Sequence, residues 1–324
     1  MRAGRGLSWA VCWVCVACGD APEPAPPPVD DRTPAAVKLD SFAPGSLDTV
    51  PDARLWARQA SAPNVYLQAN VPAALSLGLQ QGSGDVDPTC PVETRRGVTR
   101  RLTGGCTDKN GVEWVGVSEE KVGLTGLVTT TYTGFGYLKT VTCEGRTARL
   151  KLAYTGTHAV SLLRETQRFE THLVTEAVTV EPETCAETST FSAMEYEGRV
   201  EGVTSSSPDA QSKPTTWNGS GRIGNSVLGT ISAVTRDEVT HVQSCATEAL
   251  SGSTTLGADG HRVVIQYDGA TDCADTATVR WSLDGAERGT LSGINCAAAN
   301  GPTLALWGVL GLLSVMRRRA TGSH

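Results

Sequence analysis

The chain has 324 residues, of which 40% are hydrophobic and only 5% aromatic, and its formal net charge is −6. An acidic chain repels the phosphate backbone, so the composition argues against nucleic-acid binding. Ten cysteines indicate an oxidising compartment if the chain is exported, because disulfides persist there.

The N-terminus has the pattern of a secretory signal. Residues 1–17 contain Arg2 and Arg5 followed by an apolar run that is too short to span a membrane. The run ends in a small residue directly before Cys18, which resembles the lipobox of bacterial lipoproteins, although Cys15 stands where leucine is usual. The resemblance implies that Cys18 is the lipidated first residue of the mature protein. Ordinary cleavage after Ala17 or Ala21 is the alternative.

Residues 18–51 are rich in proline, most densely between positions 22 and 28. Proline at this density favours a stiff, extended segment without a core. We therefore interpret 18–51 as a tether that holds a folded domain away from the membrane.

Residues 52–295 contain the folded part, as one large domain or two subdomains. This region is rich in Thr, Ser, Val and Gly, which favours strands, and turn sequences such as Asp259-Gly260 and Asp284-Gly285 recur along it. The clearest predicted strands are 125–132, 148–154, 173–180, 262–267 and 276–283. Short helices are alternatives at 71–80 and 159–169. The fold class predicted is all-β, an antiparallel meander that forms a sandwich or a curved sheet closed as a partial barrel.

Six cysteines lie between the two terminal signals, enough for three disulfides. The six candidates are Cys90, Cys106, Cys143, Cys185, Cys245 and Cys273. Cys90 and Cys106 are close enough in sequence to enclose a compact loop. Cys143 with Cys185 follows by elimination once Cys245 is assigned to Cys273.

Turn geometry offers two partners for Cys273. A three-residue loop at 258–260 would pair residue 257 with 261 and place Cys245 opposite Cys273. A two-residue turn at Asp284-Gly285 would instead place Cys273 opposite Cys296. We favour the first pairing, since the second leaves another thiol alone, but the sequence leaves the connectivity open.

The C-terminal segment, 296–324, has the composition of a sorting or membrane-anchoring signal. Cys296 and small residues precede an apolar run at 304–316, and Arg317, Arg318 and Arg319 follow it. The run alone would make a helix of about 20 Å, shorter than a bilayer core of about 30 Å, whereas starting at Ala297 gives enough residues to span. The arginines are a cytoplasmic stop by the positive-inside rule.

This order of cysteine, small residues, hydrophobic helix and arginines resembles the myxobacterial C-terminal sorting signal. The resemblance covers about the last 30 residues and differs from the usual form in Asn295, which stands in place of glycine, and in the five residues after the arginines. It implies that the tail holds the protein in the inner membrane until a protease removes it near Cys296. The protein would then reach the cell surface, with Cys296 as the modified residue.

No nucleophile elbow, zinc-protease, P-loop or dinucleotide motif occurs in the sequence. We therefore predict no catalytic residue, no metal and no cofactor. Asp268, Asp272 and Asp275 gather in one loop-like stretch and are a weak calcium candidate, but their spacing is not that of an EF-hand and a solvated turn is favoured.

These features predict an exported lipoprotein of the cell envelope, at the outer membrane or cell surface, that acts as a structural or interaction module without enzymatic activity. Its expected partners are the membrane, through lipid or the C-terminal helix, the export and processing machinery, and an unknown surface partner. A carrier of hydrophobic ligands and a secreted hydrolase are the alternatives. A concave face with bulky apolar residues would favour the carrier. Two carboxylates about 5–10 Å apart in a cleft would favour the hydrolase.

Overall fold

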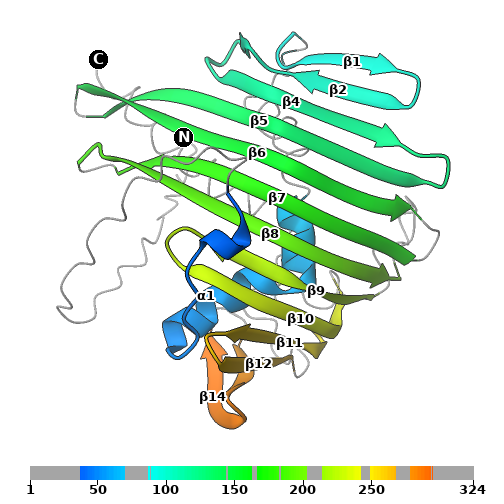
Figure 1. Ribbon diagram of the computed structural model, residues 1–324, viewed down its shortest axis with the longest axis vertical. Helices are drawn as coiled ribbons and strands as arrows, with labels where there is room; N and C mark the ends of the chain where they lie inside the picture. The colour runs from blue at the N-terminus through cyan, green and yellow to red at the C-terminus, as the bar shows by residue number, and fades with distance from the viewer. Residues whose placement is uncertain are drawn as a thin grey trace, which may run out of the picture.

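The computed structural model describes residues 37–69, 87, 89–143, 145–162, 166–181, 184–202, 214–241, 249–267, 278–292 and 294. These residues form one open antiparallel sheet (Figure 1). Each strand pairs with the next along the chain, except that β2 pairs with β4, which also pairs with the short β3. The predicted all-β antiparallel meander is therefore confirmed. Among the described residues its strands form one open sheet, and not the sandwich or partial barrel that we predicted.

The strands of this sheet are long in its middle and short at both edges. They are β1 (Val92–Arg96), β2 (Thr99–Thr103), β3 (Cys106–Thr107), β4 (Glu113–Val122), β5 (Leu127–Cys143), β6 (Arg146–Leu162), β7 (Thr166–Val180), β8 (Glu187–Glu201), β9 (Thr215–Asn225), β10 (Gly229–Thr240), β11 (Ser251–Ala258), β12 (His261–Tyr267), β13 (Thr278–Leu283) and β14 (Ala286–Ser292). The alternative helix at 159–169 is wrong, because its described residues, 159–162 and 166–169, belong to β6 and β7. The alternative helix at 71–80 lies outside the described residues.

One face of the sheet, which we call the inner face, holds the core. Large side chains alternate onto it from successive strands, including Trp114, Phe135, Phe169, Tyr196 and Trp217. Trp114 stacks on Phe135, and Phe169 stacks on Tyr196 with ring centroids 6.1 Å apart. This alternation is what a half-buried antiparallel sheet requires.

Glycines on β8 and β9 give the inner-face rings room to lie flat on the sheet. A Cβ on Gly198 would lie 2.3 Å from Cζ of Phe169, and one on Gly219 would lie 2.5 Å from Cε1 of Tyr196. Because each ring covers the backbone of the next strand, the glycines in this strand pair serve packing rather than turns.

Helices from the N-terminal side of the domain cover the inner face. They are α1 (Val50–Ala60) and the helical residues 62–69. Thr49 caps α1 by accepting a hydrogen bond from the backbone N–H of Asp52. The buried side of α1 has helical spacing and consists of Ala53, Trp56, Ala57 and Ala60. Its alanines allow a close approach to the sheet.

The segment before α1 packs on the opposite face, which we call the outer face. The short helix η2 (Leu39–Ser41) lies in front of the sheet in the view of Figure 1. A Cβ on Gly224 of β9 would lie 2.8 Å from both Leu39 and Phe42, and Pro44 forms a bridge to Thr230 of β10. The last part of the segment assigned to the tether, from residue 37 onward, thus contacts the sheet.

Two of the three predicted disulfides are confirmed. Cys90 is bonded to Cys106 and Cys143 to Cys185. Cys245 and Cys273, the third predicted pair, lie outside the described residues.

The register used to pair Cys245 with Cys273 is wrong by one residue. Ala258 pairs with His261, so the turn contains two residues, Asp259 and Gly260, both with positive φ. Such a turn matches the twist of the strands better than the three-residue loop we predicted. The rival register begins as predicted, with Leu283 opposite Ala286, but shifts by one residue at a bulge before Arg280. Neither hairpin register now selects a partner for Cys273.

Candidate functional site

The inner face contains a buried chain of hydroxyl groups where the two helical segments meet. The Tyr196 hydroxyl donates to Oγ1 of Thr235 at 3.4 Å, and Thr235 is hydrogen-bonded to Thr254 at 3.1 Å. Tyr267 donates to Thr254 at 3.2 Å, and the backbone N–H of Ala62 donates to Thr235 at 2.9 Å. Burial raises the pKa of Tyr196, so its hydroxyl stays protonated. These groups hold the helices on the sheet.

His158 is a buried histidine on the inner face. Its side chain is 3% exposed, and its Nδ1 lies 2.8 Å from Oγ1 of Thr171 on β7. Among the described residues its Nε2 has no hydrogen-bond partner. Burial lowers the pKa of His158 to about 4, so the ring is neutral at pH 7.

Tyr66, from the helical residues 62–69, lies over this part of the inner face. Its ring centroid is 5.1 Å from that of Phe169, 5.4 Å from that of Trp217 and 5.9 Å from that of His158. The chain's own aromatic side chain therefore occupies the space that a ligand would need at this point.

The outer face is polar and carries ion pairs between neighbouring strands. Lys151 on β6 contacts Glu176 on β7 at 2.5 Å. Arg222 on β9 contacts Glu195 on β8 at 3.1 Å and also reaches Asp40 of η2. Exposed pairs of this kind contribute about 0–1 kcal/mol each, so they shape the surface more than they stabilise the fold.

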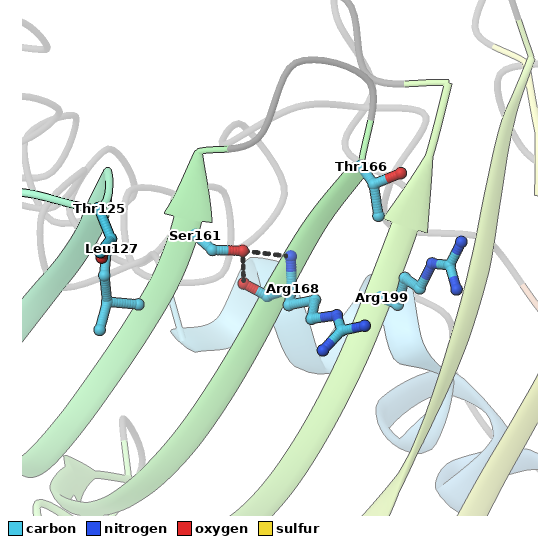
Figure 2. Close-up of a pocket in the computed structure, with 6 residues that line it drawn as sticks. All are labelled: Thr125, Leu127, Ser161, Thr166, Arg168 and Arg199. Carbon is cyan, nitrogen blue, oxygen red and sulfur yellow. Dashed lines mark hydrogen bonds between the residues drawn. The ribbon is translucent and has the colours of Figure 1, made fainter.

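A shallow hollow of about 550 Å³ lies on the outer face at one end of β5–β8. The strand register places four of its residues in one row, because Leu127 pairs with Ser161, Ser161 with Arg168, and Arg168 with Arg199. We call it the arginine hollow, and its residues are Thr125, Leu127, Ser161, Thr166, Arg168 and Arg199. Figure 2 shows both arginine side chains extending from the same side of the sheet, with a helix behind it.

The two guanidinium groups of the arginine hollow differ in their partners. Arg199 pairs with Glu201 two residues along β8, whereas the Arg168 guanidinium has no ion pair or hydrogen bond within the described residues. Ser161 accepts a hydrogen bond from the backbone N–H of Arg168 at 3.0 Å, which fixes the row. Like charges directly opposite each other destabilise a sheet, so this pair costs the protein stability when nothing binds between them.

A second hollow on the outer face is smaller and internally compensated. It has a volume of about 260 Å³, and its residues include Arg101 and Glu119, which form an ion pair at 3.3 Å. Because its arginine already has a carboxylate partner, this hollow is the weaker candidate for a charged ligand.

Most site residues predicted from the sequence lie outside the described residues. These are Cys18, Cys296, Arg317, Arg318, Arg319, Asp268, Asp272 and Asp275. Within the described part of the chain, no group of three potential metal ligands converges and no helix is long and apolar enough to span a bilayer.

Sequence reasoning missed the arginine hollow. Arg168 and Arg199 are 31 positions apart in the numbering, and only the register of β7 against β8 makes them neighbours. Comparison with protein families, curated proteins and solved structures finds no match for this chain.

Proposed function

We propose that this chain is an exported cell-envelope protein, anchored through Cys18 or its C-terminal segment, whose sheet acts as an interaction module. One observation supports an interaction module above the alternatives. On the inner face α1 and residues 62–69 pack on the core, whereas the outer face is polar and, apart from residues 37–44 that pack on β9 and β10, open to solvent. A partner would therefore contact the outer face and the ends of the strands.

The charge of the mature chain fits this role. Without the two terminal signals, 23 basic residues remain against 34 acidic ones, a net charge of −11. Such a surface resists non-specific contact with polyanions, so binding would be confined to local basic sites such as the arginine hollow.

Intact-mass analysis of the protein purified from its native envelope tests the location. We expect a chain that starts at a lipidated Cys18, ends near Cys296 and gains two hydrogens per disulfide on reduction. On intact cells, a membrane-impermeant amine reagent should label the exposed Lys121. A mass that retains residues 297–324, or a Lys121 that is labelled only after lysis, would contradict surface display.

The hydrophobic-ligand carrier is a second candidate, favoured by one observation. Bulky side chains do line the inner face on successive strands, and Tyr66 covers His158, Phe169 and Trp217 there. A carrier would have to displace residues 62–69 to expose this surface.

Extraction of the protein purified under mild conditions, followed by lipid mass spectrometry, separates the two candidates. A carrier should contain stoichiometric lipid, and Tyr66→Ala should change the amount bound. Two results together support the interaction module. The purified protein contains no lipid, and the native chain and Tyr66→Ala give the same fluorescence with an apolar dye.

A further inference from the structure

We propose that the end of the sheet containing the arginine hollow docks on a membrane surface, with the phosphate of an anionic lipid headgroup between Arg168 and Arg199. This inference rests on the proposed envelope location. It is carried by two features at the same end of the sheet: the two arginines of the hollow, of which Arg168 has no ion pair within the described residues while Arg199 is paired with Glu201, and a group of exposed apolar side chains beside them.

The chemistry of the hollow suits a tetrahedral oxyanion. Arg168 and Arg199 are directly paired in the register of β7 and β8, and planar guanidinium forks bind phosphate oxygens in pairs, so a phosphate would bind Arg168 and compete with Glu201 for Arg199. The hydroxyls of Thr125 and Thr166 also line the hollow, and neither makes a hydrogen bond within the described residues. A phosphate would relieve the repulsion between the arginines and give these donors an acceptor.

Exposed apolar residues lie at the same end of the strands as the hollow: Val98 in the turn before β2, Val122 at the end of β4 and Leu124 in the turn before β5. We call Val98, Val122 and Leu124 the apolar tip. Their exposed fractions are 59%, 39% and 108%, and the backbone N–H of Val122 donates to the carbonyl of Val98. Leu124 precedes Thr125 and Leu127 of the hollow, and Leu127 is itself 41% exposed.

This combination selects a lipid surface over a soluble phosphate. Apolar side chains that enter the acyl region, beside basic side chains at headgroup level, are the two attractions that peripheral membrane proteins combine. A free phosphate ester would use the arginines but leave Leu124 in water.

Acidic residues confine the docking surface to this end of the sheet. The next row along the strands pairs Glu170 with Glu197, so two carboxylates stand directly behind the two arginines. Anionic lipid is repelled from that row and from the acidic chain as a whole. The sheet should therefore meet the membrane with its end rather than its face.

The test uses the full chain on vesicles and reads out position rather than binding, because other parts of the chain can also anchor it. A polarity-sensitive fluorophore is attached to a Leu124→Cys variant. The matched control is Val227→Cys, since Val227 is 51% exposed in the turn between β9 and β10, at the opposite end of these strands. The unsubstituted chain gives the background labelling of native thiols.

On phosphatidylcholine vesicles containing phosphatidic acid, we expect a blue shift at position 124 and none at 227. Each arginine near an anionic surface contributes roughly fivefold to affinity, so Arg168→Gln with Arg199→Gln should raise the lipid concentration for the half-maximal shift roughly thirtyfold. Arg236→Gln, an exposed arginine elsewhere on the sheet, should change nothing.

Three outcomes would overturn the inference. The first is no shift at position 124 on vesicles with phosphatidic acid. The second is a shift that the double arginine variant retains at the same lipid concentration, which would mean that apolar contact alone drives the docking. The third is tight binding of glycerol 3-phosphate without any shift on vesicles, which assigns the hollow to a soluble ester. A failed intact-mass test would affect the location only, so the two failures are distinguishable.

Discussion

Lowering the pH from 7 to 5 should destabilise this protein through His158. The folded-state pKa of His158 is lowered by burial to about 4, against 6.5 for an exposed histidine. Between these values the unfolded chain binds a proton that the folded chain excludes, so the free energy of unfolding falls as the pH falls through this window. At about 1.4 kcal/mol per pH unit, His158 alone should remove about 2 kcal/mol between pH 7 and pH 5.

The measurement is the free energy of unfolding in urea at pH 7 and pH 5, for the native chain and for His158→Asn. Asparagine can still bond to Thr171 but does not titrate, so the variant should lose about 2 kcal/mol less between the two pH values. His172→Asn is the matched control, because His172 is exposed on the outer face next to Glu170. An equal pH response in the native chain and His158→Asn would refute the reasoning.

Three further substitutions test the packing described above, each by urea unfolding. Gly198→Ala should cost about 1–3 kcal/mol, because the new Cβ would lie 2.3 Å from the Phe169 ring, and an unchanged midpoint would show that the ring moves freely. Thr49→Ala should cost about 1 kcal/mol through the lost cap of α1, and a neutral result would mean that packing alone holds this helix end. Without added anion, Arg168→Thr should stabilise the protein by up to about 1 kcal/mol by removing the repulsion with Arg199, an effect that should shrink at high salt.

The sequence predicted the strands because their chemistry is local. Threonine- and valine-rich runs favour the extended backbone, and Asp259-Gly260 and Asp284-Gly285 are hairpin turns as expected. The register of the Asp259-Gly260 hairpin was missed because a two-residue turn and a three-residue turn both place this glycine at a positive φ. The Thr155-Gly156 pair has turn composition but lies within β6, where Gly156 instead allows the close approach of His172 on β7.

The helices on the inner face were missed because of their context. Thr49 and Asp52 form a cap, and apolar residues follow at helical spacing, but the proline-rich sequence before them favoured an extended tether. Pro51 lies in the first turn of α1, where proline is tolerated, so it begins the helix rather than ending the tether.

The long central strands give the two ends of the sheet separate surroundings. β5 contains 17 residues, so it is about 55 Å long at about 3.3 Å per residue. One end of β5 adjoins the apolar tip and the arginine hollow, and the Cys143–Cys185 bond ties its other end to the connection between β7 and β8. Because the inner face is filled by α1 and residues 62–69, the strands between these ends act as a rigid spacer. A partner bound at the disulfide end would then be held about 55 Å from any membrane that the apolar tip contacts.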